Sequence, residues 1–205
     1  MMSLASLLHR GSQNASRMLA KWIGKPSVVE IDSLEQLELE EAADLLHAEE
    51  VPMCFCLTQI NGLLSGNLIL AFDDESGLAL ADMLLEQPER TSDQWTEMAT
   101  SAALETTNIL ACAYLNEIAS CLADPDTSAT CLPCPPRFSR DFASSLLEFA
   151  LMGQAISDEK IIVGRTRFEI DRKLVHWTLL LIPDAPSIDR LSTLLAKIES
   201  AAGET

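Results

Sequence analysis

Hydrophobic residues recur at helical spacing in two long segments of the chain. In residues 3–23 the spacing of three and four between apolar positions favours an amphipathic helix, which ends at Gly24 and Pro26. A second helix is expected to follow Ser92, a residue that can cap a helix N-terminus, and to continue to Ala123. The apolar positions of the first segment are Leu4, Leu7, Leu8, Ala15, Met18, Leu19 and Trp22.

Strand-like segments lie between and after these helices. Val51–Ile60 and Leu63–Phe72 are separated by Asn61-Gly62, a dipeptide that favours a tight hairpin turn. The other expected strands are Ser27–Leu39, Thr130–Phe138, Ile161–Ile170 and Leu174–Ile182, and the other expected helices are Glu40–Glu50, Asp74–Glu86, Phe142–Met152 and Ile188–Ile198.

The order of elements occurs twice along the chain. A shift of 99 residues superposes the two long helices, so that Leu19 falls on Ile118 and Ala20 on Ala119. This pattern favours a two-copy duplication over a solenoid with a short period. We therefore predict one α+β domain over residues 1–205, with a pseudo-two-fold relation between repeats of about 1–90 and 91–205, and an antiparallel sheet packed with long helices.

The composition narrows the class of protein. The chain of 205 residues has 14 Lys and Arg against 31 Asp and Glu, a net charge of −17. This balance argues against nucleic-acid binding and against a polybasic membrane-binding surface. The hydrophobic content of 48% excludes general disorder. No apolar run approaches the roughly 20 residues that a membrane span needs, so we expect no membrane insertion.

The six cysteines are too sparse for a disulfide framework in a chain of this length. Cys131-Leu-Pro-Cys134 is the only CxxC motif, and it lacks a second pair of ligands, so no metal site is predicted. We expect a cytoplasmic protein with reduced thiols.

One polar cluster stands out on the second long helix. Ser101, Glu105 and Asn108 lie within about 60° of one another on a helix, and the small Cys112 follows on the same face. A carboxylate beside a carboxamide can pair with a cation and orient a water molecule, but neither group is a strong nucleophile. The same spacing also fits an ordinary solvated helix face.

The cluster resembles the signature of the CheC/CheX/FliY phosphatases of bacterial chemotaxis. The resemblance includes Pro133 and extends to Asn108–Asn116, to Cys134-Pro-Pro136 and, in the first half, to Asn14–Pro26. It implies a CheC-like fold and hydrolysis of the aspartyl phosphate of a CheY-type response regulator. In that reaction Glu105 pairs with a cation of the regulator, Asn108 orients the attacking water, and Ser101 has a supporting role. The resemblance implies no cofactor in this chain, because the Mg²⁺ belongs to the regulator.

The first half departs from this pattern. By the shift of 99 residues, Ser6 stands where the family has its Glu, and His9 stands where it has its Asn. His9 can donate a hydrogen bond, but Ser6 lacks the charge of a carboxylate. We therefore expect a degenerate first site and a single active helix, the second.

Two other functions stay open. The chain can be a non-catalytic binding module for a response regulator, for CheD or for a component of the flagellar switch, although docking alone does not require the amide of Asn108. An enzyme unrelated to chemotaxis is the third alternative, but no nucleophile–base pair is visible to support it.

The charge is unevenly distributed between the two halves. Residues 1–25 hold four basic side chains and no acid, whereas residues 91–136 hold six acidic side chains and no base. The acidic segment carries the intact motif. We therefore expect a regulator to meet a different surface at each half, which fits one site better than two.

Overall fold

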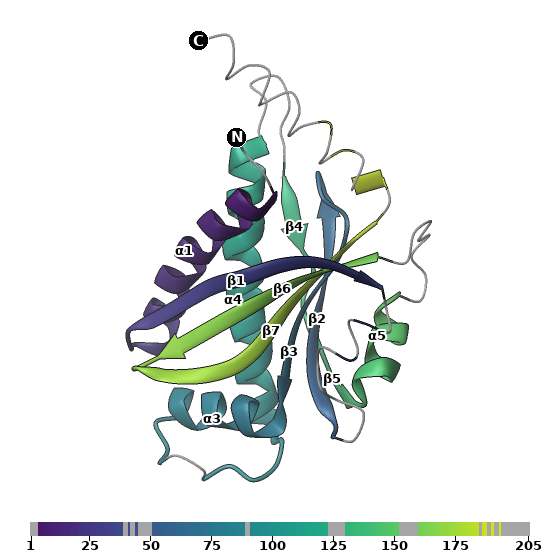
Figure 1. The fold of residues 1–205 in the computed structure, drawn as a ribbon. Helices are drawn as coiled ribbons and strands as arrows, with labels where there is room; N and C mark the ends of the chain where they lie inside the picture. Colours follow the sequence, from purple (N-terminus) through teal and green to yellow (C-terminus); the bar gives the residue numbers. More distant parts are fainter. Residues whose placement is uncertain are drawn as a thin grey trace.

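In the computed structural model, helices lie on both faces of one curved sheet. The structure describes residues 4–38, 41, 44, 51–88, 91–122, 130–151, 160–184, 186–187, 190 and 193. The long helices α1 (Leu4–Ile23) and α4 (Glu97–Leu122) run side by side on one face. The shorter α3 (Asp74–Leu84) packs against α4, and α5 (Ala143–Leu151) covers part of the opposite face (Figure 1).

The sheet has seven strands in the order β1-β6-β7-β3-β2-β4, and β5 also pairs with β2. Every pairing is antiparallel, which confirms the predicted α+β class with an antiparallel sheet packed against long helices. Read from one edge of the sheet, β1, β3 and β2 take the same places that β4, β7 and β6 take from the other edge, as a pseudo-two-fold relation requires. The duplication itself stays a prediction. The strands are β1 (Ser27–Glu38), β2 (Met53–Gly62), β3 (Gly66–Asp73), β4 (Cys131–Pro133), β5 (Arg137–Asp141), β6 (Lys160–Ile170) and β7 (Lys173–Pro183).

The alternation of side chains along β2 builds two separate cores. Cys54 and Cys56 point toward α1 and α4 and belong to the larger core, which also contains Tyr114. Phe55 points the other way, into the smaller core beneath α5. Successive strand residues face opposite sides of a sheet, so both faces of this one are covered by helices.

Helices α1 and α4 are antiparallel and pack closely. Ser12 Oγ lies 2.9 Å from the hydroxyl of Tyr114, and Asn14 Nδ2 donates to the carbonyl of Ala113 at 3.2 Å. Gly11 allows the close approach, because a Cβ at this position would lie 2.5 Å from the Tyr114 ring. Burial raises the pKa of Tyr114 to about 12, so its hydroxyl is neutral and remains a hydrogen-bond partner at physiological pH.

The charge difference between the two halves is partly compensated within the molecule. Arg10 Nε, in the basic first segment, lies 2.7 Å from Glu117 Oε1 in the acidic second one. Since α1 lies beside α4, the two segments share one helical layer. The uneven charge therefore also supports the pairing of the two long helices, in addition to giving the halves different outer surfaces.

The predicted cap of the second long helix is wrong. Helix α4 begins at Glu97, where Thr96 Oγ1 accepts a hydrogen bond from the Ala99 amide at 3.1 Å. The amide of Ser92 instead donates to the buried carboxylate of Asp82 at 3.0 Å. That contact holds the preceding segment as a loop and delays the helix by one turn.

The predicted Asn61-Gly62 turn is also wrong. Both residues belong to β2, and the connection to β3 consists of residues 63–65. Gly62 has φ of +115° and lies against Thr130, where a Cβ would be 2.1 Å from the carbonyl oxygen. Its freedom is therefore used for the close approach of β4 rather than for a tight turn.

The expected strand Thr130–Phe138 is two strands, β4 and β5, which both pair with β2 and are separated by Cys134-Pro-Pro136, where the prolines lack amide donors. The remaining elements agree with the pattern to within a few residues. The expected helices Glu40–Glu50 and Ile188–Ile198 lie largely outside the described residues. Within the part of the chain that the structure describes, no helix is both long and apolar enough to span a bilayer.

Replacement of Gly11 by Ala tests the packing of the two long helices. Although Ala is the better helix former by about 1 kcal/mol, overpacking against Tyr114 is expected to lower the free energy of unfolding by about 1–3 kcal/mol. Urea denaturation measures the change. The exposed Gln13→Ala on the same helix is the control and should stay within about 0.5 kcal/mol of wild type; a stabilised Gly11→Ala variant would contradict the packing described.

Candidate functional site

The predicted cluster lies on the outward face of α4. Ser101 and Glu105 are exposed, and Asn108 and Cys112 are half-buried. The Cys112 thiol lies 3.9 Å from Asn108 Oδ1, to which it donates. Burial, and to a smaller degree the charge of Glu105, raise the pKa of Cys112, so this thiol stays neutral. The structure thus brings the three predicted side chains together on one accessible surface.

The residues between Glu105 and Asn108 anchor this part of the helix. Thr106 and Thr107 are fully buried, and their hydroxyls donate to the carbonyls one turn back at 2.8 and 2.9 Å. Thr106 also accepts a hydrogen bond from the indole of Trp22 in α1 at 3.1 Å. Because the helix is fixed on both inner sides, the outward pair has a defined direction.

Pro133 lies on the same side of the sheet as α4. It pairs with Ile60 in the register of β2 and β4, and Ile60 belongs to the core beneath α4. Opposed residues of antiparallel strands project to the same face, and β4 packs directly against α4. The motif residue Pro133 is therefore adjacent to the helix that carries Glu105 and Asn108.

The two first-half positions lie elsewhere. His9 is exposed and Ser6 is half-buried on α1. The neighbouring Arg10 pairs with Glu117, which is about 18 Å along α4 from Glu105 at 1.5 Å per residue. Ser6 and His9 therefore do not join the cluster on α4.

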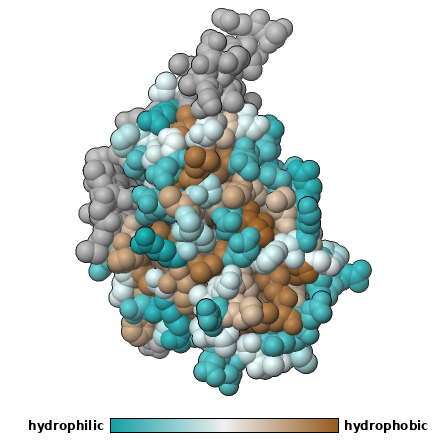
Figure 2. Space-filling view, turned by 180° about the vertical axis from the view of Figure 1, so that it is seen from behind, coloured by the Kyte–Doolittle hydropathy of each residue, from teal (hydrophilic) through white to brown (hydrophobic). Residues whose placement is uncertain are grey.

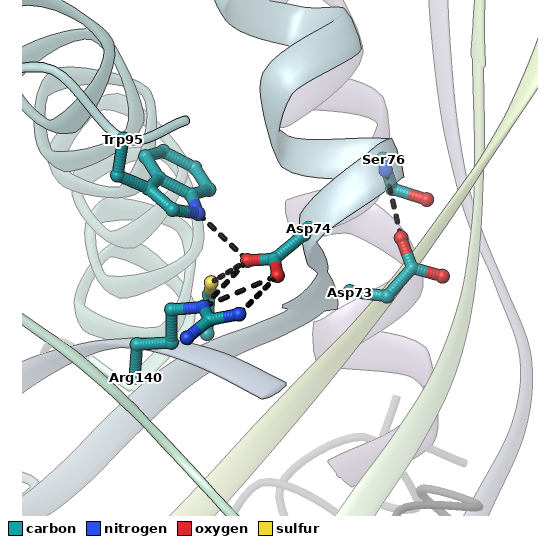
Figure 3. Close-up of polar contacts among 6 residues, drawn as sticks. Asp73, Asp74, Ser76, Trp95 and Arg140 are labelled. Carbon is teal, nitrogen blue, oxygen red and sulfur yellow. Dashed lines mark hydrogen bonds and ion pairs between the residues drawn. The ribbon is translucent and has the colours of Figure 1, made fainter. Parts of the chain in front are cut away.

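A cluster that the sequence did not predict fixes the beginning of α4 (Figure 3). The carboxylate of Asp74 accepts hydrogen bonds from Arg140 Nη2 at 2.6 Å and from Trp95 Nε1 at 2.7 Å. The thiol of Cys54 donates to the same carboxylate at 3.3 Å. Trp95 precedes α4 and also packs on the Phe138 ring, with ring centres 4.7 Å apart. The cluster thus ties the start of α4 to α3 and β5.

The pKa of Asp74 reflects this environment. Hydrogen bonds from Arg140, with a smaller contribution from Trp95, lower the pKa from the ordinary 3.8 to about 2 against an opposing effect of burial. The expected helix Asp74–Glu86 does begin at this carboxylate, and Asp73 caps α3 by accepting from the Ser76 amide at 2.7 Å. Nothing in the local pattern indicated Arg140, which is 66 residues away.

The other candidate features lie apart from this face. A groove of about 760 Å³ opens on the α5 side of the sheet, and no residue of the predicted site lines it; its wall includes Leu57, Pro136, Arg137, Phe138 and Phe149. Cys134 also lines the groove, and its sulfur accepts from Asn61 Nδ2 at 3.2 Å. Among the described residues no group of three His, Cys, Asp or Glu side chains gathers as a metal-ligand set.

Substitution of Asp74 by Asn tests the anchoring cluster. A carboxylate whose pKa is lowered on folding stabilises the protein above its unfolded pKa of about 4, and this stabilisation is lost as the pH falls toward 2. The variant should therefore be less stable than wild type at neutral pH, with a difference that shrinks between about pH 4 and pH 2.

Urea denaturation across this pH range measures the difference. The exposed Asp93→Asn in the loop before α4 is the control and should leave the stability at neutral pH unchanged. Equal stability of the Asp74→Asn variant and wild type at pH 7 would contradict the anchoring role.

Known proteins resemble this one in structure, but none matches it by sequence. No protein-family model matches the sequence, and no curated protein matches it. FliY of Thermotoga maritima is similar in structure, with a TM-score of 0.75 and 12% identity over 95% of this chain and 94% of that one. The FliM middle domain of Vibrio alginolyticus has a TM-score of 0.63 and 12% identity over 92% and 96% of the two chains.

The third similar structure is a complex of CheX with CheY, BeF₃ and Mg²⁺ from Borrelia burgdorferi. Its TM-score is 0.50, with 14% identity over 87% of this chain and 98% of that one. These neighbours agree with the fold that the motif resemblance implied. The chain has the CheC-like fold that FliY, the FliM middle domain and CheX share.

Proposed function

We propose that this protein is a cytoplasmic phosphatase that hydrolyses the aspartyl phosphate of a CheY-type response regulator, with α4 as its active helix. The observation that carries the proposal is the pair Glu105 and Asn108, which share the outward face of a helix fixed on both inner sides. The CheC-like fold adds support, because a neighbour with this fold is known in a complex with CheY.

The chemistry follows from what the two side chains can do. At a spacing of three residues they stand about 4.5 Å apart along the helix axis and point the same way. Glu105 accepts hydrogen bonds from a cationic side chain of the regulator and fixes the docked orientation. Asn108 can donate through its NH₂ group and accept through its carbonyl, so it holds a water molecule by two directed contacts.

The reaction depends more on the position of the attacking water than on the nucleophilic strength of a protein side chain. The water oxygen attacks phosphorus in line with the scissile P–O bond, the aspartate carboxylate of the regulator leaves, and inorganic phosphate is released. The Mg²⁺ bound by the regulator neutralises charge on the phosphoryl oxygens. Ser101, one turn before Glu105 on the same face, is small enough to let the regulator approach.

Substitution of Asn108 by Ala tests the catalytic role. Loss of a water-positioning group is expected to lower the rate of phosphate release by about 10²–10³-fold. The assay is phosphate release from phosphorylated CheY-type receivers of the same organism. Asn116→Ala is the matched control, because Asn116 is exposed on the same helix beyond the cluster and its loss should leave the rate unchanged. An unchanged rate with Asn108→Ala would overturn the assignment.

The proposal of one active helix has its own test. The double variant Ser6→Ala, His9→Ala removes the polar groups at the first-half positions and should retain the full rate of phosphate release. A loss comparable to that of Asn108→Ala would instead assign catalysis to α1 as well.

A non-catalytic binding module is the second candidate. The observation in its favour is that the FliM middle domain shares the fold with a TM-score of 0.63, between those of FliY at 0.75 and CheX at 0.50. In that case the wild-type protein would bind a regulator, CheD or a flagellar switch component without accelerating loss of phosphate. The same phosphate-release assay, paired with a binding measurement, separates the two functions.

A further inference from the structure

Met98 lies on the same helix face as the proposed catalytic pair. Met98, Ser101, Glu105 and Asn108 follow a spacing of three and four residues, and they fall within about 80° of one another at 100° per residue. Met98 precedes Glu105 by two turns, about 10 Å along the axis. Its side chain is 61% exposed, although methionine is usually buried.

No packing role accounts for this exposure. Among the described residues of α4, Met98 is the single large hydrophobic side chain that is exposed. The core-facing side of this end of the helix is occupied by the buried Ala99 and Ala103. Figure 2 shows the helix side of the molecule, where patches of hydrophobic residues lie among hydrophilic ones. Single exposed hydrophobic residues are common on protein surfaces, so what distinguishes Met98 is its place on the helix face of the proposed catalytic pair.

The surroundings of Met98 define the charge of its partner. Glu97 and Glu105 are exposed on either side of it along the helix, and Asp93 is exposed in the preceding loop. Residues 91–136 contain no Lys or Arg. The surface therefore suits a partner that presents a basic side chain next to an apolar one.

The position of Met98 is fixed before any partner binds. Thr96 caps the first turn of α4, and Trp95 is held by Asp74. The backbone at Met98 is thus ordered, so that docking costs little conformational entropy there. The unbranched side chain can still adapt to an irregular surface.

We propose that Met98 is the apolar anchor of the surface on which the regulator docks, with Glu97 and Glu105 as its acidic border. This inference rests on the proposed function, since it takes the receiver domain of a CheY-type regulator as the partner. The proposal gives different residues of α4 different roles. Met98 and the acidic residues determine how tightly the receiver binds, whereas Asn108 determines how fast the aspartyl phosphate of the bound receiver is hydrolysed.

Met98→Gln tests the inference, because Gln has a similar length and helix propensity but loses apolar contact on binding. Burial of the exposed part of a methionine corresponds to about a five- to twentyfold change in affinity. The variant should therefore raise the Kd for a receiver loaded with BeF₃⁻ and Mg²⁺ by that factor. It should raise KM for phosphate release similarly and leave kcat unchanged. Phe149→Gln is the matched control: Phe149 is also 61% exposed, but it lies on α5 across the sheet.

The outcomes separate this inference from the proposed function. An unchanged Kd for Met98→Gln, with turnover still abolished by Asn108→Ala, would overturn the docking role and leave the phosphatase intact. Wild-type binding that Met98→Gln weakens, without any turnover, would support the docking surface and overturn the phosphatase. Equal weakening by Phe149→Gln, or no binding by the wild-type protein, would overturn the docking surface.

Discussion

The close contact between α1 and α4 is the constraint on which the rest of the structure depends. Gly11 lets the ring of Tyr114 lie directly on the α1 backbone, and the buried hydroxyls of Ser12 and Tyr114 hydrogen-bond to each other there. Because the two helices pack so closely, they form a continuous layer that covers one face of the sheet. Because α4 then has α1 on one side and the sheet on another, only its outward side is left for solvent. The side chains on that side are the ones that can meet another protein.

This arrangement explains why the polar residues of α4 fall into two groups. Thr106 and Thr107 point inward, and their hydroxyls bond to the helix backbone, so that they are buried without an unsatisfied polar atom. Glu105 and Asn108 flank them in sequence but point outward. The inward pair is buried, and Trp22 of α1 donates to Thr106, so the outward pair has a fixed direction. Rigidity of this kind is what a residue that positions a water molecule requires.

The sequence predicted what depends on local periodicity and missed what depends on distant contacts. The long helices and the strand pairs were found because their hydrophobic spacing is set by the helix and strand repeats themselves. Ser92 was assigned as a cap because its local pattern is right, but the buried Asp82 binds its amide first. The Asp74–Arg140 pair joins residues that are far apart in the chain, so no local pattern contains it. Ser101, Glu105 and Asn108 could be placed on one face because a single helix carries all three.

The fold by itself does not select between a phosphatase and a binding module, since FliM and CheX share it. The outward residues of α4 favour the phosphatase, because packing gives no reason for their identities. Helix α1 packs on the same face of the sheet with Ser6 and His9 at the positions that the repeat matches to Glu105 and Asn108. A helix in this layer therefore does not need a carboxylate and an amide at these two positions in order to pack on the sheet. A purely adhesive surface would gain from more apolar residues like Met98, whereas the carboxamide of Asn108 offers a donor and an acceptor on one side chain, which suits the proposed role of holding a water molecule.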